Sequence, residues 1–165
     1  MRLATRALAA AVFLAAGCAG SEVPPAELDA GNQLCASCRM PVDDPRLAAQ
    51  ITAPREEPRF FDDIGCLADY LSVSQPLQKG AVLYVADHHT KAWVRAEKAL
   101  FTRSPRVDTP MGSHLVAHAD AASRDRDPAA REGTPVSFED TLRVSGPAAP
   151  RGSATPARRA GEVRP

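Results

Sequence analysis

The chain has 165 residues with 20 basic and 20 acidic side chains, so its formal net charge is zero. This balance hides an uneven distribution: two arginines in the first 17 residues and a net charge of +4 from residue 143 onward leave −6 for residues 18–142. An acidic body disfavours nucleic acid as a partner and favours cationic partners or metal ions, and its length corresponds to about one ordinary domain.

The N-terminus has the pattern of a bacterial lipoprotein leader. An apolar run at residues 7–16 follows two arginines, and small residues stand directly before Cys18. The run is shorter than the roughly 20 residues that span a bilayer. We therefore predict a signal peptide over 1–17, lipid attachment at Cys18 and a tether over 18–32, and Ala19 favours the outer membrane. The alternative is an ordinary secreted protein with a free cysteine.

Soft sulfur donors gather in the stretch CASCRM, where Cys35, Cys38 and Met40 form a C-x-x-C-x-M motif. Thiolates and thioethers suit Cu(I). The spacing also fits a disulfide or a redox dithiol, although redox pairs usually start a helix and two prolines follow closely here. Half of a zinc knuckle is a further alternative, although no second pair of cysteines or histidines follows at zinc-finger spacing. With Cys18 lipidated, three cysteines remain, so at least one stays free, pairs elsewhere or binds metal.

The first predicted half, residues 33–90, has the order strand, strand, helix, strand. Asp62 or Asp63 caps the helix, which places Cys66 in its first turn. The helix dipole favours a Cys66 thiolate and the two carboxylates oppose it, whereas a small buried cysteine is the simpler interpretation. The elements are strands at 47–52, 59–61 and 81–86 and a helix starting at 64 and ending before Pro76.

The second predicted half, residues 91–144, repeats this order without a visible sequence repeat. Two such small halves would stabilise one another by packing, so we predict an α+β fold of two ββαβ halves. Residues 145–165 are rich in Arg, Pro and Ala, which predicts a disordered tail. The elements are apolar segments at 92–95 and 99–102, strands at 115–118 and 135–138, and a helix over 119–132 that Asp127-Pro128 interrupts.

Further candidate ligands are a methionine and four histidines. Met111 stands between Pro and Gly on a loop, where packing does not easily explain it. His114 and His118 share one face of a predicted strand, which could also be its solvent face. His88 and His89 lie in a predicted turn, where histidines are usually solvated.

In their order, the lipobox and the motifs CxxCxM, FDDIGC, YVAD, KAW and TPMG resemble the NosL family, the accessory lipoproteins of nitrous-oxide reductase, over about residues 35–140. The resemblance implies a lipid-anchored Cu(I) chaperone and two ββαβ halves related to organomercurial lyase. It places copper ligands on Cys38, Met40 and Met111. Family members commonly have Gly where this chain has Arg39, and Gly allows a positive φ.

We therefore expect a non-enzymatic Cu(I) metallochaperone on the periplasm-facing membrane surface. Its expected partner is nitrous-oxide reductase or the assembly machinery of that enzyme, and a homodimer is compatible with this function. The main alternative is a thiol–disulfide oxidoreductase that uses Cys35 and Cys38. A lyase or other thiol enzyme based on Cys66 and a structural lipoprotein with one disulfide are the other two. Further candidate metal ligands are Cys35, Cys66, His114 and His118.

Overall fold

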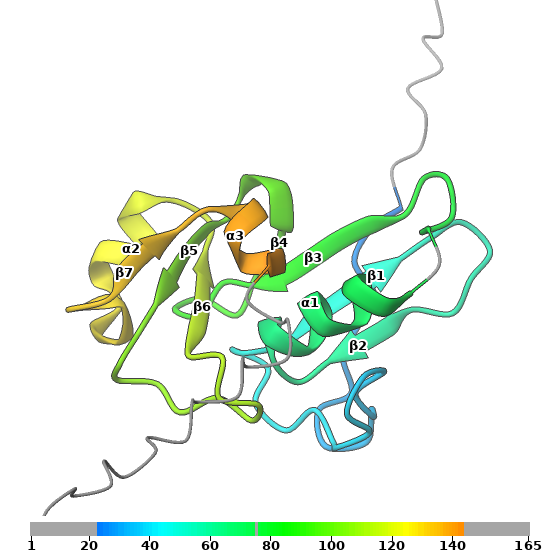
Figure 1. The fold of residues 1–165 in the computed structure, drawn as a ribbon, viewed down its shortest axis with the longest axis horizontal. Helices are drawn as coiled ribbons and strands as arrows, with labels where there is room; N and C mark the ends of the chain where they lie inside the picture. The colour runs from blue at the N-terminus through cyan, green and yellow to red at the C-terminus, as the bar shows by residue number, and fades with distance from the viewer. Residues whose placement is uncertain (1–22, 75, 144–165) are drawn as a thin grey trace, which may run out of the picture.

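The computed structural model describes residues 23–74 and 76–143 (Figure 1). The predicted leader, Cys18 and the tail of residues 145–165 lie outside the described residues. The described chain forms two small antiparallel sheets with a few helices, which confirms the predicted α+β fold of two ββαβ halves. Within these residues no helix combines the length and the apolar character needed to cross a membrane.

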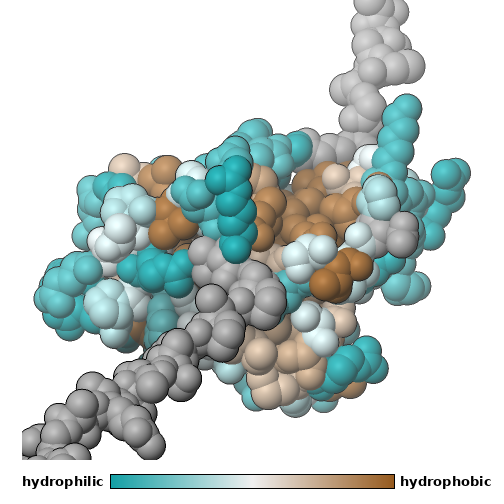
Figure 2. Space-filling model, viewed as in Figure 1, coloured by the Kyte–Doolittle hydropathy of each residue, from teal (hydrophilic) through white to brown (hydrophobic). Residues whose placement is uncertain are grey.

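The first half forms a four-stranded sheet in the order β2-β1-β3-β4, with every pair antiparallel. Helix α1 (Ile64–Val73) packs on β1 and β2, and its first five residues are buried. Figure 2 shows hydrophobic side chains gathered over α1 and β3 on this face. The strands are β1 (Ala49–Thr52), β2 (Arg59–Phe61), β3 (Val82–Ala86) and β4 (Trp93–Arg95).

The described part of the predicted tether, residues 23–32, packs against this sheet. Gln50 is fully buried on β1, and its side-chain amide accepts the Ala26 N–H at 2.7 Å and donates to the Ala26 carbonyl at 3.1 Å. The Tyr84 hydroxyl donates to the carbonyl of Val23. These residues therefore belong to the folded body, because a buried amide on a central strand needs polar partners and the chain next to it supplies them.

Strand β4, which we expected to open the second half, pairs with β3 of the first sheet. The connection from Asp87 to Ala92 is a tight turn, in which the Asp87 N–H donates to the Ala92 carbonyl and the Lys91 N–H donates to the Asp87 carbonyl. Lys91 has a φ of 66°, the left-handed conformation that closes such turns. A connection this short places the next strand beside the preceding one.

The second half forms a three-stranded sheet in the order β6-β5-β7. The predicted interruption at Asp127-Pro128 is confirmed, because a 3-10 turn η2 (Pro128–Ala130) starts there and Asp127 caps it. The predicted strand over 135–138 ends earlier, since the Ser137 hydroxyl accepts the Asp140 N–H and starts a helix. The elements are η1 (Ala96–Lys98), β5 (Leu100–Arg103), β6 (Leu115–His118), α2 (Ala121–Arg126), β7 (Thr134–Val136) and α3 (Phe138–Arg143).

The two halves share one hydrophobic core, to which β1, β2, α1 and β3 contribute together with β5 and β6. Helix α3 packs on α1, and the rings of Phe101 and Phe138 stack at 6.0 Å. Buried Asp87 joins the halves at the end of β3 by accepting the Ala119 N–H and the Ser123 hydroxyl. Burial raises the pKa of this carboxyl, but the hydrogen bonds outweigh burial and lower the pKa to about 2.

A second buried carboxylate, Asp63, joins the halves at the start of α1. Its side chain caps the helix by accepting the Gly65 N–H at 2.7 Å. It also accepts the Met111 N–H at 3.0 Å and the Ser113 hydroxyl, both from the loop before β6. The loop lies so close that a Cβ added to Gly65 would stand 2.8 Å from the Ser113 Cβ. Asp63 therefore fixes the Met111 loop against the first turn of α1.

We expect Asp63→Ala to lower the free energy of unfolding by about 2–4 kcal/mol, because it removes a helix cap and leaves buried donors of the Met111 loop without a partner. Asp120→Ala is the matched control, since Asp120 caps α2 from an exposed position by accepting the Ser123 N–H. It should cost only about 1 kcal/mol, the value of an ordinary cap. Urea denaturation measures both, and equal losses would show that the loop contacts contribute nothing.

Candidate metal centre

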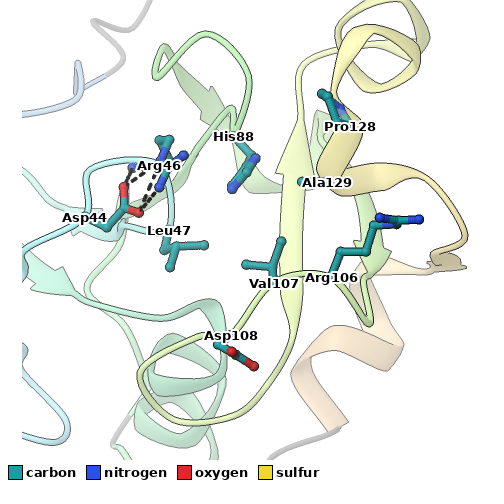
Figure 3. Close-up of a pocket in the computed structure, with 9 residues that line it drawn as sticks. All are labelled: Asp44, Arg46, Leu47, His88, Arg106, Val107, Asp108, Pro128 and Ala129. Atoms are coloured by element: carbon teal, nitrogen blue, oxygen red, sulfur yellow. Dashed lines mark hydrogen bonds and ion pairs between the residues drawn. The ribbon is translucent and has the colours of Figure 1, made fainter.

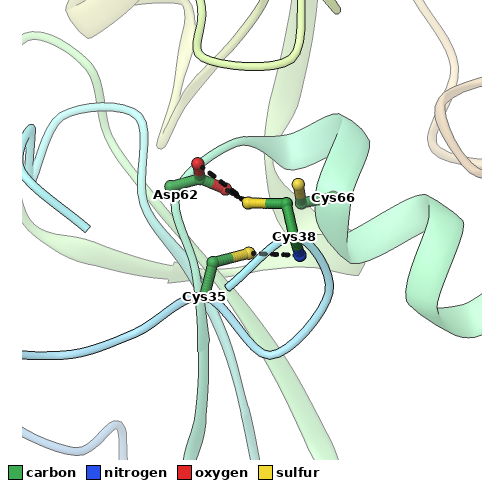
Figure 4. Close-up of side chains that lie close together, drawn as sticks. All are labelled: Cys35, Cys38, Asp62 and Cys66. Atoms are coloured by element: carbon green, nitrogen blue, oxygen red, sulfur yellow. Dashed lines mark hydrogen bonds between the residues drawn. The ribbon is translucent and has the colours of Figure 1, made fainter. Parts of the chain in front are cut away.

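Four side chains with metal-binding atoms converge beside the start of α1 (Figure 4). They are Cys35, Cys38, Asp62 and Cys66, and one ligand atom of each lies within 4.8 Å of those of the others. All three cysteines are free thiols. Cys35 and Cys66 are fully buried, whereas Cys38 is partly exposed. We call these four residues the cysteine cluster.

The loop that carries Cys35 and Cys38 is closed by backbone hydrogen bonds. The Cys35 N–H donates to the Met40 carbonyl at 2.8 Å, and the Arg39 N–H donates to the Cys35 carbonyl at 3.0 Å. The Ala36 N–H donates to the Phe60 carbonyl, which fastens the loop to β2. The loop is no helix start, so it lacks the usual setting of a redox dithiol.

Arg39 adopts the left-handed conformation, with a φ of 69°. A glycine at this position would reach that conformation without strain, whereas a non-glycine residue pays of order 1 kcal/mol for it. Arg39 nevertheless keeps the turn and places an exposed cationic side chain next to Cys38 in the chain.

The pair Asp62-Asp63 divides two tasks between adjacent carboxylates. Because Asp63 caps α1, Asp62 is free to face the cluster, where its two oxygens accept the Cys38 thiol at 3.3 and 3.5 Å. Sequence reasoning treated both residues as candidate caps and left Asp62 out of the site. The signal was present, since only one residue can occupy the cap position and the other then lies next to the motif cysteine Cys66.

The three thiols differ sharply in acidity. A hydrogen bond from the Cys66 thiol lowers the pKa of Cys35 to about 6. Burial, together with hydrogen bonds to Cys35 and to Asp62, raises the pKa of Cys38 to about 11. Donation to Cys35, together with burial, also raises the pKa of Cys66. At neutral pH the cluster therefore contains one thiolate, Cys35, and two thiols.

The two candidate methionines are exposed to solvent, Met40 by 39% and Met111 by 48%. Met40 lines an open pocket of about 530 Å³ together with Asp62 and with Thr109-Pro110, which directly precede Met111. The Asp63 hydrogen bond places the Met111 backbone next to the start of α1. Loops from both halves thus meet around this pocket, whose lining includes Asp62 of the cysteine cluster.

The candidate histidines lie apart from the cysteine cluster. The His114 Nδ1–H donates to the Val107 carbonyl at 2.7 Å, and the residue lines a different pocket with Glu132 and Thr134. His118 is fully buried and contacts Asp127, as does His88. His89 is exposed in the turn before β4. The structure thus places His118 in a separate group with His88 and Asp127.

We expect the reduced, metal-free protein to gain one thiolate as the pH rises through about 6, because Cys35 has a depressed pKa and ionises first. Thiolate ultraviolet absorbance under anaerobic conditions measures this step. Cys66→Ala should move it upward toward 9, the ordinary value for a cysteine, since the hydrogen-bond donor is lost. Cys38→Ser is the control and should retain the step. A parent protein without any thiol ionisation below pH 8 would contradict the assignment.

Comparison with known proteins gives one match. The family model NosL matches residues 25–143, which is more than half of the chain and includes the whole cysteine cluster and Met111. Searches of the curated proteins and of the solved structures found no match, so the expected relation to organomercurial lyase stays a prediction. The family is a copper-binding accessory family, and the free cysteine cluster is a group of residues that could hold such a metal. The chain belongs to the NosL family.

Proposed function

We propose that this protein is a Cu(I) metallochaperone that delivers copper for assembly of the copper–sulfur centre of nitrous-oxide reductase. The observation that carries the proposal is the convergence of three free thiols, each of which has its sulfur within 4.8 Å of the other two and of an Asp62 oxygen. Sulfur donors of these two kinds select Cu(I) over harder ions. Family membership supports the association with copper.

The arrangement favours release as well as binding. Cys35 supplies a thiolate at neutral pH, and its complete burial protects it from solvent. Cys38 is partly exposed, so an incoming sulfur or imidazole from a partner can reach an ion held there. Met40 and Met111 provide neutral thioethers, which a stronger donor displaces. Copper would leave by ligand exchange, without a covalent step.

Asp62 would serve the loading step as a positioning residue. Its carboxylate accepts the Cys38 thiol at 3.3 Å, so it orients the sulfur and lies where the thiol proton is lost when copper binds. A carboxylate oxygen is a hard donor and a poor ligand for Cu(I). We therefore propose that Asp62 positions Cys38 and that the sulfur atoms bind the ion.

The acidities argue against a thiol–disulfide oxidoreductase. In such an enzyme the thiol that a partner can reach must ionise near neutral pH. Here the reachable thiol is Cys38, whose pKa is raised to about 11, while the acidic Cys35 is fully buried. Accessibility to a partner and ionisation near neutral pH are therefore properties of different cysteines.

A thiol enzyme based on Cys66 meets a similar obstacle. Cys66 is fully buried in the first turn of α1, and its pKa is raised by its hydrogen bond to Cys35. A nucleophile needs a thiolate that a substrate can approach. Cys66 is better suited to stabilise the Cys35 thiolate than to attack a substrate.

Competition with a chromogenic Cu(I) chelator under anaerobic conditions tests the ligand set. We expect Cys38→Ser to weaken Cu(I) binding by about 100-fold or more, and Met40→Leu and Met111→Leu to weaken it by about tenfold each. Each substitution removes a soft sulfur donor and roughly conserves the volume of the side chain. Asp62→Asn should weaken binding by about tenfold, the lower end for a group that orients a ligand.

His114→Gln is the control for this experiment, because His114 lines another pocket. It should leave the affinity unchanged. If the three sulfur variants compete for Cu(I) as well as the parent does, the assigned site is wrong. If Cu(I) binding depends on the cysteines but is indifferent to both methionines, the proposed route of transfer fails while copper binding stands.

Delivery and anchoring are tested together in cells that lack the native protein. We expect the parent to restore the copper content of nitrous-oxide reductase and to fractionate with membranes. Cys38→Ser should remain in the membrane fraction and fail to restore copper, because it removes a ligand and not the anchor. Cys18→Ser should leave the membrane fraction, because no lipid can be attached. A reductase that acquires full copper with Cys38→Ser would contradict the proposed delivery.

A further inference from the structure

A second group of metal-ligating side chains lies where the two halves meet. His88 stands in the turn after β3, His118 ends β6, and Asp127 connects α2 to η2. One ligand atom of each lies within 4.8 Å of those of the other two. None of the three belongs to the cysteine cluster, so the copper proposal leaves their arrangement unexplained. We call these residues the histidine cluster.

Both imidazoles converge on a single oxygen. His88 Nδ1 lies 2.6 Å and His118 Nε2 lies 2.9 Å from Asp127 Oδ2, while Asp127 Oδ1 accepts the Ala129 N–H at 2.8 Å. The three residues are 8%, 0% and 4% exposed, respectively. His118 Nδ1 has no hydrogen-bond partner among the described residues, so within this part of the chain the ring hydrogen-bonds through Nε2 to Asp127.

We propose that the histidine cluster is a second metal site, selective for a borderline divalent cation of the Zn²⁺ type. Two imidazoles and one carboxylate form a ligand set that such ions take, with a fourth position left for an exchangeable ligand. Ligand atoms about 2.0 Å from a tetrahedral ion lie about 3.3 Å apart. The observed contacts of 2.6 and 2.9 Å therefore have to open by only about half an ångström.

An open pocket of about 440 Å³ gives access to the cluster through His88 (Figure 3). Arg46 on its wall is paired with Asp44 at 2.6 Å, and Arg106 is paired with Glu132 at 2.5 Å. Neither guanidinium is left unneutralised to repel an incoming cation. Solvent in the pocket can occupy the fourth coordination position.

The donor atoms separate this site from the cysteine cluster. Nitrogen and oxygen donors favour Zn²⁺ and related ions, whereas thioethers such as those proposed for the copper site favour Cu(I). The position also has a consequence for stability, because the ion would join the turn after β3 to two segments of the second half. Binding to the folded state alone raises the midpoint of thermal unfolding.

Zn²⁺ and Co²⁺ are the probes for the purified, reduced protein under anaerobic conditions. We expect His88→Gln and Asp127→Asn each to lose one equivalent of bound Zn²⁺ and the Co²⁺ ligand-field bands that have no accompanying sulfur-to-cobalt charge transfer. Cys38→Ser should keep those bands. Zn²⁺ should raise the Tm of Cys38→Ser, but it should not raise the Tm of the double variant Cys38→Ser/His88→Gln, in which both sites are altered.

His89→Gln and His114→Gln are matched controls, since the chain has four histidines and these two lie outside the cluster. Both should bind Zn²⁺ as the parent does. Asp127→Asn retains an oxygen that can accept the Ala129 N–H, and the metal-free Tm of each variant shows whether it folds. Equal Zn²⁺ stoichiometry in the parent, His88→Gln and Asp127→Asn would overturn the proposal. A Cys38→Ser protein whose Tm does not rise when Zn²⁺ is added would also overturn it.

Discussion

The arrangement of the sulfur donors depends on one buried carboxylate. Asp63 accepts hydrogen bonds from the first turn of α1 and from the Met111 loop, which lies almost fifty residues further along the chain. A buried carboxylate is expensive unless it is well hydrogen-bonded, so the loop and the helix start are held where they can supply donors. That requirement brings the backbone of Met111, from the second half, to the start of the helix that carries Cys66. The neighbouring Asp62 is thereby left to face Cys38.

The elements that follow from local patterning were predictable, and those that depend on distant partners were not. The helical spacing of apolar residues after Asp63 identified α1, and Pro128 identified the break after α2. The sheet to which β4 belongs depends on the backbone of the turn after Asp87, and the docking of residues 23–32 depends on buried Gln50. In neither case do the neighbouring residues in the sequence indicate the partner.

The same distinction holds at the site. The motif cysteines were recognisable because their spacing is local, whereas the role of Asp62 required knowing which of two aspartates caps the helix. His118 was a candidate for the copper site because sequence alone does not place a strand residue against one loop or another. In the fold it faces Asp127, nine residues later, and not the cysteines. Chemistry-bearing residues are visible in the sequence, but their grouping is a tertiary property.

Differences in burial protect the three thiols of the cysteine cluster from oxidation. Oxidation and exchange require a thiolate that is exposed. In this protein the ionised sulfur, Cys35, is buried, and the partly exposed sulfur, Cys38, is kept protonated by a pKa of about 11. In the proposed function an arriving Cu(I) ion displaces the Cys38 proton, since Cu(I) is a soft ion that suits thiolate sulfur. The metal-free cluster is therefore protected by burial and by protonation, and a metal that binds has to compete with a proton for the Cys38 sulfur.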